Sequence, residues 1–84
     1  MEILFFSGEH CGACKKFLPV AEKMFESKGV KFKYTDIGTQ EGNLLASKYC
    51  IMSLPTILFI DKGKPMNMIT GYNPSALEKA LDRM

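Results

Sequence analysis

Two short runs of large apolar residues constrain the fold more than any other feature of this sequence. Residues 3–6 read Ile-Leu-Phe-Phe and residues 57–60 read Ile-Leu-Phe-Ile, without the polar alternation of a strand that has one wet face. Strands of this composition are buried on both faces, and the first run is typical of a parallel sheet. The two runs therefore predict an α/β fold, in which helices flank a sheet.

The length and composition leave room for one hydrophobic core. The chain has 84 residues, of which 46% are apolar and 24% are charged. This balance is typical of a small globular protein and excludes a disordered chain. We therefore expect a single domain over residues 1–84, present as a monomer.

Charge and hydropathy exclude two classes of partner. Eleven Lys and Arg against nine Asp and Glu give a net charge of +2, and the basic residues form no run. Nucleic-acid-binding surfaces need a basic patch. The longest apolar stretch is four residues, whereas a membrane helix needs about 20, and the start of the chain does not resemble a signal peptide. We expect neither a nucleic-acid nor a membrane partner, and a cytoplasmic location.

Periodicity predicts the elements between the two apolar runs. Large apolar residues recur every three to four positions over residues 11–27, which indicates an amphipathic helix that ends before Gly29. Residues 30–35 alternate between apolar and polar types, as in an edge strand with one solvated face. Thr39 is the expected N-cap of a short helix that runs to Lys48.

The last third of the chain adds a hairpin and a helix. Residues 61–64 read as a hairpin turn, so residues 65–70 should return antiparallel to the second apolar run. Asn73 followed by Pro74 is typical of an N-cap and a first helical position. The inner face of this helix is expected to hold Leu77, Ala80, Leu81 and Met84. The predicted order is βαβ, a short helix, then ββα, with a four-stranded mixed sheet flanked by helices.

Cys11 and Cys14 form a Cys-Gly-Ala-Cys motif at the start of the first helix. The unpaired N–H groups and the dipole of a helix N-terminus favour a thiolate at Cys11, and Lys15 adds a nearby positive charge. Cys14 lies one turn later on the same face, within reach of a disulfide. Gly12 and Ala13 leave the approach open. The pair suits thiol–disulfide exchange, in which Cys11 attacks and Cys14 resolves the mixed disulfide.

Two other interpretations of the cysteine pair stay open at this point. The pair is either structural or half of a zinc site, for which His10 and Cys50 count as further ligands. Structural zinc sites usually repeat a close cysteine pair, whereas Cys50 stands alone, so we expect no metal. Cys50 is interpreted as a small buried hydrophobe, with a regulatory or partner-linking thiol as the alternative. Methionines such as Met52, Met66 and Met68 are interpreted as core residues, with a contact to partners as the alternative for Met52.

The chain resembles the thioredoxin superfamily over nearly its whole length. The resemblance rests on the cysteine motif after a buried strand, Pro19 inside the helix, Ser53-Leu-Pro-Thr56 before a core strand, and Gly71 after the last strand. It implies a thioredoxin-like fold and a disulfide oxidoreductase with no bound cofactor, whose redox-active group is the Cys11–Cys14 disulfide. Such proteins serve electron transport and cell redox homeostasis.

The same resemblance implies a substrate groove. Members of the superfamily place a cis-proline opposite the cysteine pair, and Pro55 matches that residue. The Leu54 backbone would then offer strand-like hydrogen bonds to a substrate peptide. The active-site rim is assigned to His10, Gly12, Ala13, Leu54, Pro55, Gly71 and Tyr72. His10 and Lys15 are the residues expected to tune the thiolate.

The sequence also departs from both branches of the superfamily. His10 stands where typical thioredoxins have Trp, and Phe5 stands where they have a buried Asp, so the usual proton relay is missing. In length the chain is closer to glutaredoxins. However, Gly12-Ala13 replaces the Pro and aromatic residue that glutaredoxins usually have between the cysteines, and Gly71-Tyr72-Asn73 replaces their Gly-Gly-Asp-like segment.

These observations predict a dithiol reductant of protein disulfides. By resemblance, its electron donor is a flavoenzyme of the thioredoxin-reductase type or glutathione. Two alternatives stay open. One is a glutaredoxin-like, glutathione-dependent reductase, and the other is a non-catalytic binding module with the thioredoxin fold, which would not explain why both cysteines are present.

Overall fold

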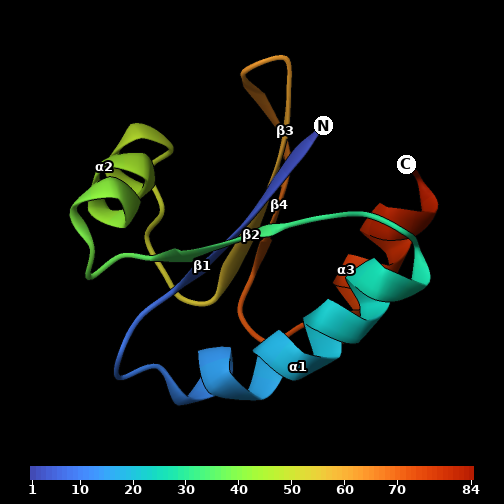
Figure 1. Cartoon of the computed structure of the whole chain (residues 1–84), viewed down its shortest axis with the longest axis horizontal. Helices are drawn as coiled ribbons and strands as arrows, with labels where there is room; N and C mark the ends of the chain where they lie inside the picture. Colours follow the sequence, from blue (N-terminus) through green and yellow to red (C-terminus); the bar gives the residue numbers. More distant parts are fainter.

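The computed structural model describes residues 1–84 and contains a mixed sheet with helices on both faces (Figure 1). The strands are β1 (Glu2–Ser7), β2 (Lys33–Asp36), β3 (Thr56–Asp61) and β4 (Lys64–Thr70), in the spatial order β2-β1-β3-β4. β1 pairs parallel with β2 and antiparallel with β3, and β3 pairs antiparallel with β4. The predicted four-stranded mixed sheet is confirmed.

The helices are α1 (Gly12–Ser27), α2 (Gln40–Lys48) and α3 (Pro74–Asp82). α1 and α3 lie together on one face of the sheet, and α2 lies on the other (Figure 1). The predicted element order, βαβ then a short helix then ββα, is therefore confirmed.

The two apolar runs form the central strands and supply both halves of the core. Successive residues of a strand point to opposite faces. Phe5 and Ile57 thus join the larger cluster beneath α1 and α3, whereas Phe6 and Leu58 join the smaller cluster beneath α2. All four side chains are fully buried. Burial on both faces explains why these runs show no alternation.

The predicted caps of the two later helices are also confirmed. Thr39 Oγ1 accepts a hydrogen bond from the Gly42 N–H at 3.0 Å and donates one to the Asp36 carbonyl at 2.7 Å. Asn73 Oδ1 accepts a hydrogen bond from the Ala76 N–H at 3.1 Å. These bonds satisfy N–H groups that a helix start otherwise leaves unpaired.

The edge strand β2 is shorter than its pattern predicts. It begins at Lys33, so Val30 and Phe32 precede it and pack, half-buried, against the larger core cluster. Tyr34 lies on the same face and stacks on Phe5 with ring centres 6.3 Å apart, yet remains 49% exposed. An edge strand has a neighbour on one side only, which explains this exposure.

The interpretation of Cys50 and of several methionines as core residues is wrong. Cys50 follows α2 in a left-handed turn with φ of 55°, and its side chain is exposed. Met52 is 91% exposed. Met66 and Met68 are exposed on β4, the other edge of the sheet, and Met84 is exposed beyond the end of α3. The β-strand side chains, α1 and α3 fill the core without them.

Candidate active site

The pairing register brings four chain connections to one end of the sheet, where strands begin or finish. Phe6 of β1 lies opposite Thr35 of β2 and Thr56 of β3, and Thr56 lies opposite Thr70 of β4. This row marks the ends of β1, β2 and β4 and the start of β3. The connections that meet there are residues 8–11, 37–39, 49–55 and 71–73.

The cysteine pair lies in the first of these connections and the first turn of α1. Cys11 is the N-cap of α1 and forms a disulfide with Cys14, with the two Cα atoms 5.2 Å apart. The Cys14 N–H donates a hydrogen bond to Cys11 Sγ at 3.1 Å. Cys14 is only 1% exposed and belongs to the larger core cluster, whereas Cys11 is half-buried. Cys11 is therefore the sulfur that a partner molecule reaches.

The residues around Cys11 leave the site open to solvent. Gly12 and Ala13 are exposed, and a Cβ added at Gly12 would meet no atom within 4 Å. His10 is exposed in the turn before Cys11, and Lys15 is exposed one helical turn after it. Neither side chain forms a hydrogen bond or ion pair in the structure. Thiolate tuning by His10 and Lys15 stays a prediction.

Leu54 and Pro55 lie beside the cysteine connection. The Leu54–Pro55 peptide bond is cis, as the resemblance implied. A Cβ added at Gly8 would lie 3.0 Å from Leu54 Cδ1, so the Leu54 side chain packs against the segment that leads to Cys11. Leu54 and Cys11 both pack against the larger core cluster. The tertiary fold thus brings the Leu54–Pro55 segment next to the cysteine connection, although the two are far apart in the sequence.

Gly71 and Tyr72 lie at the same end of the sheet, in the connection after β4. The Gly71 N–H donates a hydrogen bond to the Pro55 carbonyl at 2.8 Å. The Tyr72 ring packs edge to face on Phe17, with centres 5.2 Å apart, and Lys16 Nζ lies 5.1 Å from the centre of the Tyr72 ring. Sequence analysis assigned Tyr72 to the rim but missed Phe17 and Lys16 as its partners. No local pattern links residues of α1 to a loop so distant in the sequence.

The structure shows no group of three or more His, Cys, Asp or Glu side chains placed to hold a metal ion. It also shows no helix that combines the length and apolar composition needed to cross a membrane. The reactive group that the structure shows at this site is the Cys11–Cys14 disulfide. A disulfide at a helix N-terminus, with one accessible and one buried sulfur, is the arrangement of a thiol–disulfide oxidoreductase.

Comparisons with known proteins place this oxidoreductase in one family. The family model for thioredoxin matches residues 2–83. Thioredoxin of Bacillus subtilis (strain 168) is 34% identical over 74 residues, which cover 87% of this chain and 71% of that protein. Thioredoxin of Staphylococcus aureus is 29% identical over 84 residues, which cover 99% of this chain and 81% of that protein.

Solved structures agree with the sequence comparisons. Malassezia sympodialis thioredoxin (Mala s 13) superposes with a TM-score of 0.88 at 30% identity, covering 96% of this chain and 71% of that chain. Oxidised mitochondrial thioredoxin 3 of Saccharomyces cerevisiae gives 0.87 at 28% identity, covering 98% and 76%. The chain belongs to the thioredoxin family, and its activity is thiol–disulfide exchange. These matches favour a thioredoxin over the glutaredoxin-like alternative.

Proposed function

We propose that Cys11 is the nucleophile and Cys14 the resolving thiol in the reduction of protein disulfides. The observation that carries this assignment is the unequal burial of the two sulfurs, since Cys14 is 1% exposed and Cys11 is half-buried. A substrate disulfide therefore meets Cys11 first. The N-terminal end of α1 favours negative charge on that sulfur.

The reaction is a pair of thiol–disulfide exchanges. The Cys11 thiolate attacks one sulfur of the substrate disulfide, and the other substrate sulfur leaves as a thiolate that takes up a proton. The Cys14 thiolate then attacks Cys11 Sγ in the mixed disulfide and releases the second substrate thiol. The substrate gains two electrons and two protons, and the Cys11–Cys14 disulfide remains. No bound cofactor takes part.

Substrate peptides are proposed to bind along Leu54 and Pro55. The Leu54 N–H and carbonyl make no hydrogen bond within the chain. Backbone groups without a partner in the chain can pair with an extended peptide in the manner of an added strand. His10, Gly12, Ala13, Gly71 and Tyr72 would form the rim that this peptide crosses.

Partners and context follow from the family. We propose that the protein works in the cytoplasm as a monomer of one domain over residues 1–84. Its substrates are disulfides of other proteins. Its electron donor is a flavoenzyme of the thioredoxin-reductase type, which restores the dithiol after each turnover.

The first test separates the roles of the two cysteines. In Cys14→Ser, Cys11 attacks but is not released, so a mixed disulfide with the substrate accumulates and is visible by mass spectrometry. Cys11→Ser should abolish the reduction of insulin disulfides. Cys50→Ser serves as the control, since Cys50 lies outside the pair, and should keep the activity of the parent. Parental activity in Cys11→Ser would contradict the assignment.

The second test concerns the electron donor. The last helix starts at Asn73-Pro74, and the proline removes one of the N–H groups with which a helix N-terminus would bind a glutathione carboxylate. We therefore expect NADPH consumption to be faster with thioredoxin reductase than with glutathione and glutathione reductase, at equal protein concentration. Faster turnover in the glutathione assay would overturn this donor assignment.

A further inference from the structure

Lys16, two residues after Cys14 in α1, holds its positive charge against the ring of Tyr72. Lys16 Nζ lies 5.1 Å from the centre of the Tyr72 ring, within the range of a cation–π contact. The Tyr72 ring packs on Phe17, which is fully buried, and Gly71 is tied to the Pro55 carbonyl. The contact with Phe17 and the hydrogen bond of the neighbouring Gly71 thus restrain Tyr72. The residue remains 43% exposed, so a partner molecule can reach it.

Few negative charges near the site oppose the positive charge of Lys16. Within the four connections at this end of the sheet, Glu9 is the only Asp, Glu, Lys or Arg residue. The first turn of α1 contains no acidic residue, and Lys15 and Lys16 follow it closely. Asp36 ends β2, the strand farthest from Tyr72 along the sheet, and accepts a hydrogen bond from the Gly38 N–H. Positive charge therefore collects on the α1 side of the site.

We infer that Lys16, positioned by Tyr72, makes the enzyme prefer protein disulfides flanked by acidic residues. This inference rests on the proposed function and adds the charge class of the substrate to it. A carboxylate beside the reactive cysteine of the substrate would approach an ammonium group that is already held in place by an aromatic ring. Less side-chain freedom is lost on binding than with an unrestrained lysine.

The expected effect is small but measurable. An exposed ion pair typically changes an equilibrium by a factor of about 1.4 to 5. Its range shrinks from about 10 Å at 0.1 M salt to about 3 Å at 1 M. The preference should therefore decline as the salt concentration rises, whereas the intrinsic rate of disulfide exchange does not require this attraction.

The test uses three peptide disulfides that differ only in the residues next to the reactive cysteine, which are Glu, Gln or Lys. Second-order rate constants for their reduction by the reduced protein are measured by acid quenching and chromatography. We expect the Glu peptide to react about two to five times faster than the Lys peptide at low salt. The Gln peptide should lie between them, and the three should converge at 1 M salt.

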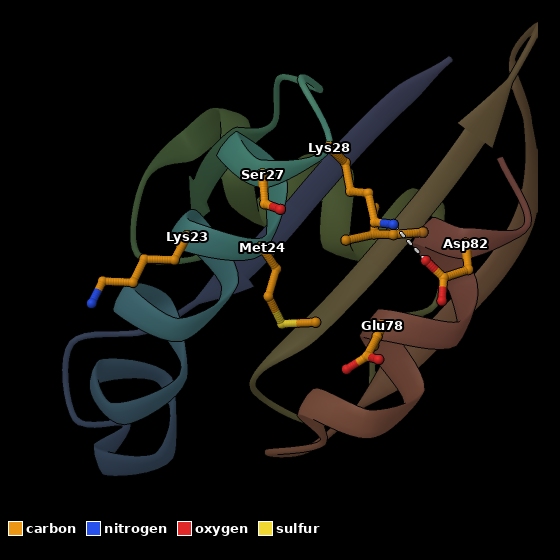
Figure 2. A pocket seen from close by; sticks show the side chains of 7 residues that line it. Lys23, Met24, Ser27, Lys28, Glu78 and Asp82 are labelled. Carbon is orange, nitrogen blue, oxygen red and sulfur yellow. Dashed lines mark hydrogen bonds and ion pairs between the residues drawn. The ribbon is translucent and has the colours of Figure 1, made fainter.

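Variants locate the source of the preference. Lys16→Gln should remove it, and Tyr72→Ala should weaken it because Lys16 is then unrestrained. Tyr72→Phe keeps the ring and should keep the preference. Lys23→Gln makes the same charge change on α1, but Lys23 lines the hollow between α1 and α3 (Figure 2), so this variant should behave as the parent.

Each contrary result has a distinct meaning. Equal rate constants for the Glu and Lys peptides in the parent, or a preference that survives Lys16→Gln, overturn the inference. An equal loss in Lys23→Gln would assign the effect to overall charge, and an unchanged preference in Tyr72→Ala would show that the ring does not position Lys16. Either result overturns the inference as well. A parent that reduces none of the three peptides contradicts the proposed function instead.

Discussion

The absence of a side chain at Gly42 determines how closely α2 approaches the sheet. It is buried in the first turn of α2, and a Cβ at this position would overlap the backbone carbonyl of Asp36. The missing side chain allows α2 to begin in contact with the end of β2. This contact explains why a glycine occupies a helical position where it costs about 1 kcal/mol relative to alanine.

Gly42→Ala should therefore destabilise the protein, although helix propensity alone favours alanine. We expect the free energy of unfolding in urea to fall by about 1–3 kcal/mol, the usual cost of forcing extra atoms into a packed site. Asn43→Ala, an exposed change in the same helix, should alter it by no more than about 0.5 kcal/mol. A Gly42→Ala protein more stable than the parent would show that the overlap is relieved without cost.

The three helices begin in the same way. In each, a side-chain atom of the N-cap accepts a hydrogen bond from the N–H three residues later, and the caps are Cys11, Thr39 and Asn73. In α1 the capping atom is the sulfur of the accessible cysteine. The N-cap atom of α1 and the accessible sulfur of the disulfide are therefore the same atom. After reduction of the disulfide, a hydrogen bond from the Cys14 N–H would stabilise a thiolate at this position.

The side-chain cap of α3 should contribute measurably to stability. Asn73→Ala removes the acceptor for the Ala76 N–H and should lower the free energy of unfolding by about 0.5–2 kcal/mol. Thermal unfolding followed by circular dichroism measures this loss. Ser75→Ala, an exposed change at the second position of the same helix, is the matched control. If both variants lose the same stability, the side-chain cap contributes nothing.

One ion pair joins two helices of the whole molecule. Lys28, the C-cap of α1, lies 2.6 Å from Asp82 at the end of α3, and Figure 2 shows this pair across the hollow between the helices. The hydrogen bond to Asp82, and then its negative charge, raise the pKa of Lys28 above its ordinary value of 10.5. The pair therefore stabilises the folded state at pH values below 10.5 and loses this effect as pH rises through the raised pKa.

Lys28→Met should accordingly lower the melting temperature slightly at pH 7 and low salt. The effect is small because both side chains are exposed. The difference from the parent should vanish in 1 M salt and at pH values well above 10.5. Lys23 lines the same hollow but forms no ion pair. Lys23→Met should therefore have the melting temperature of the parent under all these conditions. A difference that persists at 1 M salt would point to lost packing of the lysine stem rather than lost charge.

Signals in the sequence are sufficient to predict the helices and strands, their order and the cysteine pair. The apolar runs at residues 3–6 and 57–60 need cover on both faces, and the caps Thr39 and Asn73 act within one turn of their helices. These signals are local, so periodicity and residue type suffice to recognise them. The cis bond at Pro55 followed from resemblance rather than from a local signal.

Which residues are exposed, and which distant side chains meet, depends on the tertiary packing. The exposure of Cys50 and Met52 depends on how the connection after α2 turns, and the exposure of Tyr34 depends on β2 having one neighbour. The contact of Lys16 with Tyr72 requires α1 and the end of β4 to come together. Such contacts arise from packing between distant segments, which no periodic pattern within either segment records.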